Sequence, residues 1–154
     1  MLRLTTRLRA ALLVPALAAA TLAPLRAQTA ADSAAIRATA LDYVEGWYSG
    51  DADRMDRALS ADLAKRIVYS DSLGRSRLSQ MTAMGLVRGT RAGGGKDTPA
   101  DKQQKEIRIL DIFGNAASVR TTMSGWVDYM HLAKFNRRWV IVNVLWELKP
   151  GAGN

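Results

Sequence analysis

Residues 125–148, GWVDYMHLAKFNRRWVIVNVLWEL, constrain the fold more than any other part of this chain. Apolar residues recur at every second position on both sides of Asn136 and Arg137, which is the period of β-strands. Asparagine tolerates the left-handed backbone that a tight turn requires. The stretch therefore predicts two long antiparallel strands joined by a two-residue turn, and other parts of the chain must cover the sheet that they form.

Two further strands are expected just upstream of this hairpin. Residues 105–113 and 116–123 alternate in the same way, and they flank Gly114-Asn115, which is a two-residue hairpin signal. Ser124-Gly125 then turns the chain again. We expect residues 105–148 to form a four-stranded antiparallel meander.

Counting outward from the turns predicts which side chains share a face, because opposite residues in a hairpin point to the same side. The register follows from pairing the residues that flank each turn: Phe113 with Ala116, Met123 with Trp126, and Phe135 with Arg138. One face is then mostly apolar, with Leu110, Ile112, Val119, Thr121, Met123, Trp126, Met130, Leu132, Trp139, Ile141 and Leu145. The same face carries Asp128 and Asn143.

The other face of the meander is half polar. Its early strands carry Asp111, Ser118, Arg120 and Thr122, whereas its last two strands carry Val127, Tyr129, Val140, Val142, Val144 and Trp146. An apolar patch of this size calls for a partner. We expect a homodimer through the last two strands. The alternative is that a helix or the amino-terminal segment folds over the patch.

Upstream of residue 104 the apolar residues follow a helical period. We expect a helix over residues 32–49, capped by Asp32 and ended by Gly50. A second helix is expected to begin after Asp51, which caps it, and to end near Leu63. Residues 65–69 predict a short strand followed by a turn at 71–74. A third helix is expected over residues 78–91, capped by Ser79, and residues 93–101 are expected to form a mobile linker. Lys96 follows three glycines, but no Ser or Thr follows it, which argues against a phosphate loop.

The amino-terminal residues have the layout of a secretory signal peptide. Three arginines precede an apolar run over residues 10–23, and a small residue, Ala27, precedes the expected cut. The alternative is an uncleaved anchor, but the run contains Pro15 and is short for a bilayer span. We divide the chain into a signal peptide (1–27), a linker (28–34), a domain (35–149) and a disordered tail (150–154). We expect an exported protein, periplasmic or extracellular, without stable membrane insertion after cleavage.

Composition excludes several kinds of site. The chain has no cysteine and one histidine, so disulfides, a thiol nucleophile, cysteine-ligated zinc and a histidine-rich metal site are ruled out. We expect no metal and no cofactor. The net charge of +8 includes four arginines of the signal peptide, and removing them leaves +4. This mild surplus gives no reason to expect nucleic acid as a partner.

Three segments resemble a known superfamily. They are YVEGWYSGDA at residues 43–52, DYMHLAK at residues 128–134 and RWVIVN at residues 138–143. The chain resembles the nuclear transport factor 2-like superfamily over residues 35–148, most closely its lumazine-binding and SnoaL-like branches. The resemblance implies an α+β fold: a cone-shaped, cystatin-like roll with three amino-terminal helices packed on a curved antiparallel sheet and a cavity between them.

Superfamily members generally use this cavity, and some, such as ketosteroid isomerase and the polyketide cyclases, place an acidic residue in it. In this chain the resemblance points to Asp128 as a general base, with Tyr43, or else Tyr48 or Tyr69, as a hydroxyl donor to a developing oxyanion. Burial among apolar side chains would raise the pKa of the Asp128 carboxyl toward the range of a working base. The alternative is a structural Asp128, bonded to Thr121 and Asn143 or paired with an arginine. His131 is expected on the opposite face, at an interface or at the surface.

The predicted ligand-binding residues are Trp47, Tyr48, Tyr69, Met84, Thr121, Trp126, Met130, Trp139 and Asn143. A wall of tryptophan and methionine would suit a flat apolar ligand. Three functions stay open on this basis. The protein binds a small, mostly apolar molecule, or it is an isomerase, cyclase or hydrolase that uses Asp128, or it is a protein-interaction module that acts through its outer sheet face.

Overall fold

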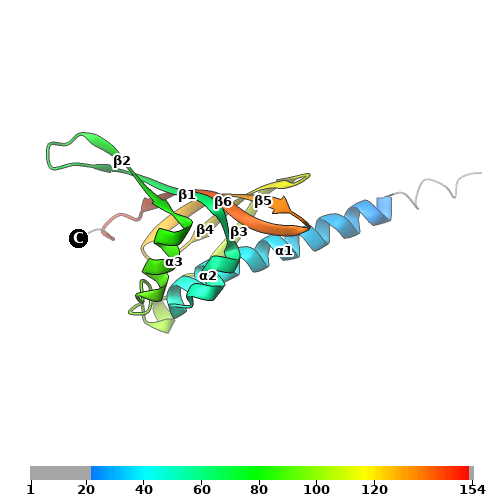
Figure 1. The fold of residues 1–154 in the computed structure, drawn as a ribbon, viewed down its shortest axis with the longest axis horizontal. Helices are drawn as coiled ribbons and strands as arrows, with labels where there is room; N and C mark the ends of the chain where they lie inside the picture. The colour runs from blue at the N-terminus through cyan, green and yellow to red at the C-terminus, as the bar shows by residue number, and fades with distance from the viewer. Residues whose placement is uncertain (1–21, 153–154) are drawn as a thin grey trace, which may run out of the picture. The chain divides into compact units, whose positions relative to one another are not determined.

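The computed structural model describes residues 22–152, with their side chains from residue 29 onward. The chain divides into two units, residues 1–31 and 32–154, and the fold described below is that of the second (Figure 1). The elements, in chain order, are α1 (Leu22–Ser49), α2 (Ala52–Ala58), β1 (Leu59–Ser70), β2 (Ser76–Thr82), α3 (Ala83–Arg91), a short 3-10 helix η1 (Ala100–Lys102), β3 (Glu106–Phe113), β4 (Ala116–Thr122), β5 (Trp126–Phe135) and β6 (Arg138–Leu148).

The strands form one curved, unclosed sheet in the order β2-β1-β6-β5-β4-β3. The predicted meander is confirmed as β3 to β6, with all three pairs antiparallel. The sheet is mixed rather than purely antiparallel, because β1 pairs with β6 in parallel. This pair places β1, and beyond it β2, on the side of β6 that faces away from β5.

The turns of the meander follow from residue type. Asn136 and Arg137 have φ values of 49° and 66°, so both central residues of the β5–β6 turn are left-handed. Two left-handed residues in a two-residue loop match the twist of the flanking strands. In the β3–β4 turn, Gly114 alone supplies the positive φ, at 57°.

Helix α1 begins at Leu22, ten residues before the predicted start at Asp32, and it ends at Ser49 as predicted. Residues 28–34, expected to be a linker, are helical. Residues 1–21 of the expected signal peptide lie outside the described residues, so that assignment stays a prediction. At the other end, residues 150–152 form a turn, and 153–154 lie outside the described residues. Among residues 22–152, no helix is both long enough and apolar enough to cross a bilayer.

The predicted extent of the second helix is wrong. Asp51 caps α2 as expected, and its carboxylate accepts from the backbone N–H groups of Asp53 and Arg54. The helix ends at Ala58 rather than near Leu63, and β1 begins at Leu59 rather than at Lys65. Pairing with β6 therefore overrides the helical spacing of this segment.

The predicted third helix is also too long. Residues 76–82 form β2, which pairs with β1 across a turn held by the Asp71 carboxylate. Helix α3 starts at Ala83, and its cap is Thr82 rather than Ser79. All seven residues of β2 are exposed, and the β1–β2 hairpin extends past the other strands in Figure 1.

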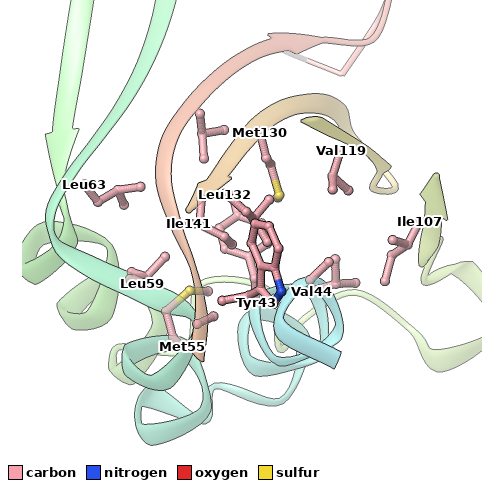
Figure 2. Packing of buried hydrophobic residues seen from close by; sticks show 14 of the residues in the cluster. Tyr43, Val44, Met55, Leu59, Leu63, Ile107, Val119, Met130, Leu132 and Ile141 are labelled. Atoms are coloured by element: carbon pink, nitrogen blue, oxygen red, sulfur yellow. The ribbon is translucent and has the colours of Figure 1, made fainter. Parts of the chain in front are cut away.

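The core lies between one face of the sheet and the helices. Figure 2 shows Tyr43 and Val44 of α1 pointing toward Met130 and Ile141 of the sheet, with Met55 of α2 beside them. These five residues are at most 2% exposed.

A bulge at Val142 changes the register of β6. Leu132 pairs with Ile141, but the next residue back along β5, His131, pairs with Asn143, so Val142 is an extra residue. A one-residue slip sends every later side chain of the strand to the opposite face. The predicted register therefore holds only from Arg138 to Ile141.

Four predicted face assignments in β6 are corrected by this bulge. Val144 and Trp146 lie on the inner face, opposite Met130 and Asp128, whereas Asn143 and Leu145 lie on the outer face. A second shift, between Ile109 and Asp111 of β3, leaves Leu110 47% exposed instead of in the core. The outer apolar patch of the last two strands is correspondingly smaller than predicted.

Candidate functional site

Asp128 on β5 is the centre of a buried polar cluster. Its side chain is fully buried and accepts four hydrogen bonds, two at each carboxylate oxygen. Lys65 Nζ and the Tyr43 hydroxyl donate to Oδ1 at 2.5 and 3.3 Å, whereas Thr121 Oγ1 and Trp126 Nε1 donate to Oδ2 at 3.2 and 2.9 Å. The predicted residues Asp128, Tyr43, Thr121 and Trp126 are thus brought together.

Lys65 of β1 is the cationic member of the cluster. Its ammonium also donates to the Tyr43 hydroxyl at 2.7 Å and lies 4.8 Å from the centre of the Trp146 ring. Burial lowers the pKa of the Lys65 ammonium, and the attraction of Asp128 opposes this shift only in part. Burial also raises the pKa of the Tyr43 phenol well above its ordinary value, and the neighbouring Asp128 charge acts in the same direction.

A pocket of about 110 Å³ opens beside this cluster. Met81, at 40%, is the most exposed of the residues that line this pocket. Its wall is almost entirely apolar, and we call it the tryptophan pocket after its three indole rings. The pocket is lined by Tyr43, Trp47, Lys65, Met81, Leu86, Trp126 and Trp146.

The three tryptophans meet edge to face. Trp47 and Trp126 have ring centres 5.8 Å apart and planes at 88°, and Trp126 and Trp146 are 6.2 Å apart at 73°. Such edge-to-face contacts are favourable arrangements for aromatic rings. They hold the pocket wall in one geometry.

The glycine run after α3 packs against the side chain of Trp47. A Cβ atom added at Gly94 or Gly95 would lie 2.4 Å from atoms of the Trp47 side chain, and the Gly95 amide donates to the Trp47 carbonyl. Residues 93–95, predicted as part of a mobile linker, are therefore packed against the pocket wall. Only glycine fits at these two positions.

Other predicted ligand-binding residues lie outside the pocket. Tyr69 on the β1–β2 hairpin and Met84 on α3 are 50% and 71% exposed. Met130 and Trp139 are buried in the core, and the Trp139 indole donates to Asp32. Tyr48 bonds through its hydroxyl to Ser124 and Gln104, and so anchors two loops.

Asn143 does not adjoin Asp128, contrary to the prediction. It lies on the outer face, where its amide accepts from Arg66 at 3.0 Å and contacts the ring of His131 at 3.3 Å. The bulge at Val142 is the reason. His131 is on the opposite face from Asp128, as expected.

Sequence reasoning missed Lys65, Trp146, Met81 and Leu86. A usable signal existed for Lys65, which lies two residues from Leu63 and from Ile67, so a strand over the whole segment would place it among apolar side chains. Starting the strand at Lys65 hid this pattern. No group of three or more metal-binding side chains occurs within the described part of the chain.

Comparisons with known proteins agree on the fold. The family model described as "Putative lumazine-binding" matches residues 31–147. No curated protein matches the chain.

Three solved structures are similar to this chain. A nuclear transport factor 2-like protein of unknown function from Shewanella baltica is 22% identical, with a TM-score of 0.59 over 79% of this chain and 97% of that one. Another from Silicibacter pomeroyi is 17% identical, with a TM-score of 0.59 over 79% and 98%. A cystatin-like member from Novosphingobium aromaticivorans is 14% identical, with a TM-score of 0.65 over 89% and 94%. These likenesses establish the predicted α+β fold.

Proposed function

Because the chain belongs to the "Putative lumazine-binding" family of the nuclear transport factor 2-like superfamily, we propose that it binds a small, flat, mostly apolar molecule in the tryptophan pocket. The observation that carries this proposal is the set of three indole rings around one pocket. Aromatic walls with a few placed polar groups are typical of small-molecule sites. The Lys65–Asp128 pair supplies the polar group here.

The volume limits the ligand to roughly one ring. An apolar cavity of about 150 Å³ is known to hold benzene, and the tryptophan pocket measures about 110 Å³. A single aromatic ring, or the ring end of a longer molecule that extends past Met81, fits this size. Lumazine, which the family description names, has two fused rings, so it tests whether a ligand larger than one ring can also enter the pocket.

Calorimetric titration with small aromatic compounds, lumazine included, tests the proposal. Met81→Trp should fill the pocket mouth and abolish binding. Met84→Trp adds the same side chain at a residue that is 71% exposed and does not line the pocket, so it should bind as the wild type does. Equal binding by both variants, or no heat from any compound, would reject the tryptophan pocket as the site.

A catalytic role for Asp128 is the second candidate function, and the Tyr43 hydroxyl at 3.3 Å from its carboxylate favours it. Asp128 itself is fully buried and does not line the pocket, so a substrate meets Lys65 and Tyr43 first. This role requires that Asp128→Asn abolish turnover of a substrate while ligand binding persists. Unchanged turnover in a folded Asp128→Asn variant would reject the catalytic role of Asp128.

The homodimer through the last two strands also remains a proposal. Its support is now Tyr129 and Leu145, which are directly paired on the outer face and about half exposed. Light scattering on a size-exclusion column should give twice the monomer mass for the wild type and the monomer mass for Leu145→Glu. A monomeric wild type at all concentrations would exclude it.

Export rests on the pattern of residues 1–27. The proposal predicts that mature protein recovered from outside the cytoplasm begins near Gln28, which amino-terminal sequencing would read directly. Recovery of the uncut chain from the cytoplasm would contradict it.

A further inference from the structure

We propose that the ligands of the tryptophan pocket are small aromatic aldehydes, held by a reversible imine to Lys65 Nζ. This inference rests on the proposed function and names the chemical class of the ligand. Among the seven residues that line the pocket, Lys65 is the one that carries an amine. Only 6% of its side chain is accessible, and it lines the pocket rather than the outer surface.

The position of the amine suits attack on a bound carbonyl group. Two of its N–H bonds have acceptors, in Asp128 and Tyr43, and the Trp146 ring lies 4.8 Å away on a wall of the pocket. A ring placed against Trp126 and Trp146 would carry a directly attached carbonyl group toward Lys65. The lowered pKa of the lysine favours the neutral amine that such an attack needs.

Charge considerations favour a neutral ligand over an acid or an amine. A carboxylate would bring a second anion beside the buried Asp128, and an ammonium would bring a second cation beside Lys65. Either charge would leave the buried site with unequal numbers of cations and anions, and an uncompensated charge is costly away from water. A carbonyl compound adds no charge and still reacts with the lysine.

The reaction balances with groups already in the cluster. Lys65 first gives one proton to Asp128 Oδ1. The neutral nitrogen then forms a bond to the carbonyl carbon while the C=O π bond breaks. The carbonyl oxygen takes up a second proton from the nitrogen and becomes a hydroxyl group. The proton on Asp128 then returns to that hydroxyl, which leaves as water as the C=N bond forms. The product is a protonated imine, still paired with the Asp128 carboxylate. No oxidant or reductant takes part.

Reductive trapping tests the proposal in the full domain. Wild-type protein is treated with benzaldehyde and cyanoborohydride, and peptide mapping locates any benzyl group. Lys134 is the matched internal control, because it is paired with Asp32 at 2.6 Å but does not line the tryptophan pocket. We expect Lys65 to be labelled at least about tenfold faster than Lys134, because only Lys65 lines the pocket that holds the aldehyde beside its amine.

Benzyl alcohol separates this inference from the proposed function, because it has the same ring and no carbonyl group. Tryptophan quenching by benzyl alcohol, together with protection of Lys65 from benzaldehyde, supports both. Quenching by benzyl alcohol without labelling of Lys65 overturns the imine and leaves the binding pocket. No quenching and no selective labelling overturns both.

Variants add a second line of evidence. Lys65→Met should lose the selective label, whereas Lys134→Met should keep it. If Lys65→Met does not fold, as judged by its near-ultraviolet circular dichroism, the wild-type peptide map with benzyl alcohol competition decides the question alone.

Discussion

Two ion pairs in this domain are built from the same parts and differ in what surrounds them. In each, a lysine pairs with an aspartate that also accepts a tryptophan indole N–H. Lys134 of β5 and Asp32 of α1 tie a helix to the sheet, with side chains 15% and 12% exposed. Lys65 of β1 and Asp128 of β5 are more deeply buried, at 6% and 0%, and their lysine faces a pocket.

The difference shows how one kind of contact serves two purposes. The Lys134–Asp32 pair stays close to solvent and lines no described pocket, so its role is to hold α1 on the sheet. The Lys65–Asp128 pair is removed from water, where each charge depends on the other. Burial next to a pocket is what turns an ion pair into a candidate site.

The largest expected effect is that of Asp128→Asn. It leaves the buried Lys65 ammonium without its counter-charge, which should lower the free energy of unfolding by about 3–5 kcal/mol. Asp32→Asn is the matched change in the more exposed pair, and it should cost about 1.5–3 kcal/mol. Urea unfolding at pH 7 measures both. Equal losses would mean that the depth of burial does not distinguish the two pairs.

Gly94→Ala should destabilise the protein less than Asp128→Asn does. Its Cβ would meet the Trp47 ring at 2.4 Å, and relieving such a clash should cost about 1–3 kcal/mol of stability. The displaced indole should also narrow the tryptophan pocket and weaken ligand binding. Gly89→Ala is the control, because its Cβ would lie 3.9 Å from the same ring, at ordinary contact distance. If both variants behave alike, the glycine loop does not support Trp47.

The two ion pairs can also be compared by replacing the tryptophan that donates to each aspartate, Trp126 for Asp128 and Trp139 for Asp32. Trp126→Phe and Trp139→Phe each remove an N–H donor to a carboxylate, at a cost of about 1.5–3 kcal/mol before any loss of packing. Only Trp126→Phe should also weaken binding of a small aromatic probe, since Trp139 does not line the tryptophan pocket. Calorimetric titration of both folded variants would show this, and loss of binding in both would place the site elsewhere.

The smallest effect is a pH dependence specific to Lys65. Because its pKa is lowered on folding, the unfolded chain binds more protons between that lowered pKa and the ordinary lysine value of 10.5. The stability of the wild type relative to Lys65→Met should therefore rise with pH in this window. Above pH 10 the raised pKa of Tyr43 acts in the opposite direction. Urea unfolding from pH 7 to 10 measures the difference, and a relative stability that falls over this range would contradict the lowered pKa.

Most of the fold was predictable because the meander has both an alternating pattern and recognisable turns. The segment from Leu59 to Thr82 was not, because Met55 and Leu59, like Met81 and Met84, have helical spacings across what are in fact strand boundaries. Pairing of β1 with β6 and with β2 decides this segment, and the β1–β6 pairing joins residues far apart in the sequence, so it leaves no local pattern.

The candidate site was predictable only in part. Asp128, Thr121 and Trp126 follow from the register of β4 and β5, which is intact, whereas Tyr43 was proposed from the family resemblance. Trp146 and Asn143 were placed on the wrong faces because the run around Val142 is apolar at almost every position, so its pattern does not reveal an extra residue. Lys65 was missed because its strand was started too late.

Val142 reverses the alternation of faces along β6, because it is one extra residue in a strand whose side chains alternate with a period of two. From Arg138 to Ile141, the face of each side chain follows from counting outward from the turn. From Asn143 onward, each side chain lies on the face opposite to the one that this count gives. Deleting this one residue would remove the bulge and keep Trp146 opposite Asp128, because Asn143 would then follow Ile141 directly and still pair with His131. Among relatives of this chain, a β6 that is one residue shorter between its turn and its tryptophan should therefore place that tryptophan in the pocket wall without a bulge, whereas a β6 of this length needs the bulge to do so.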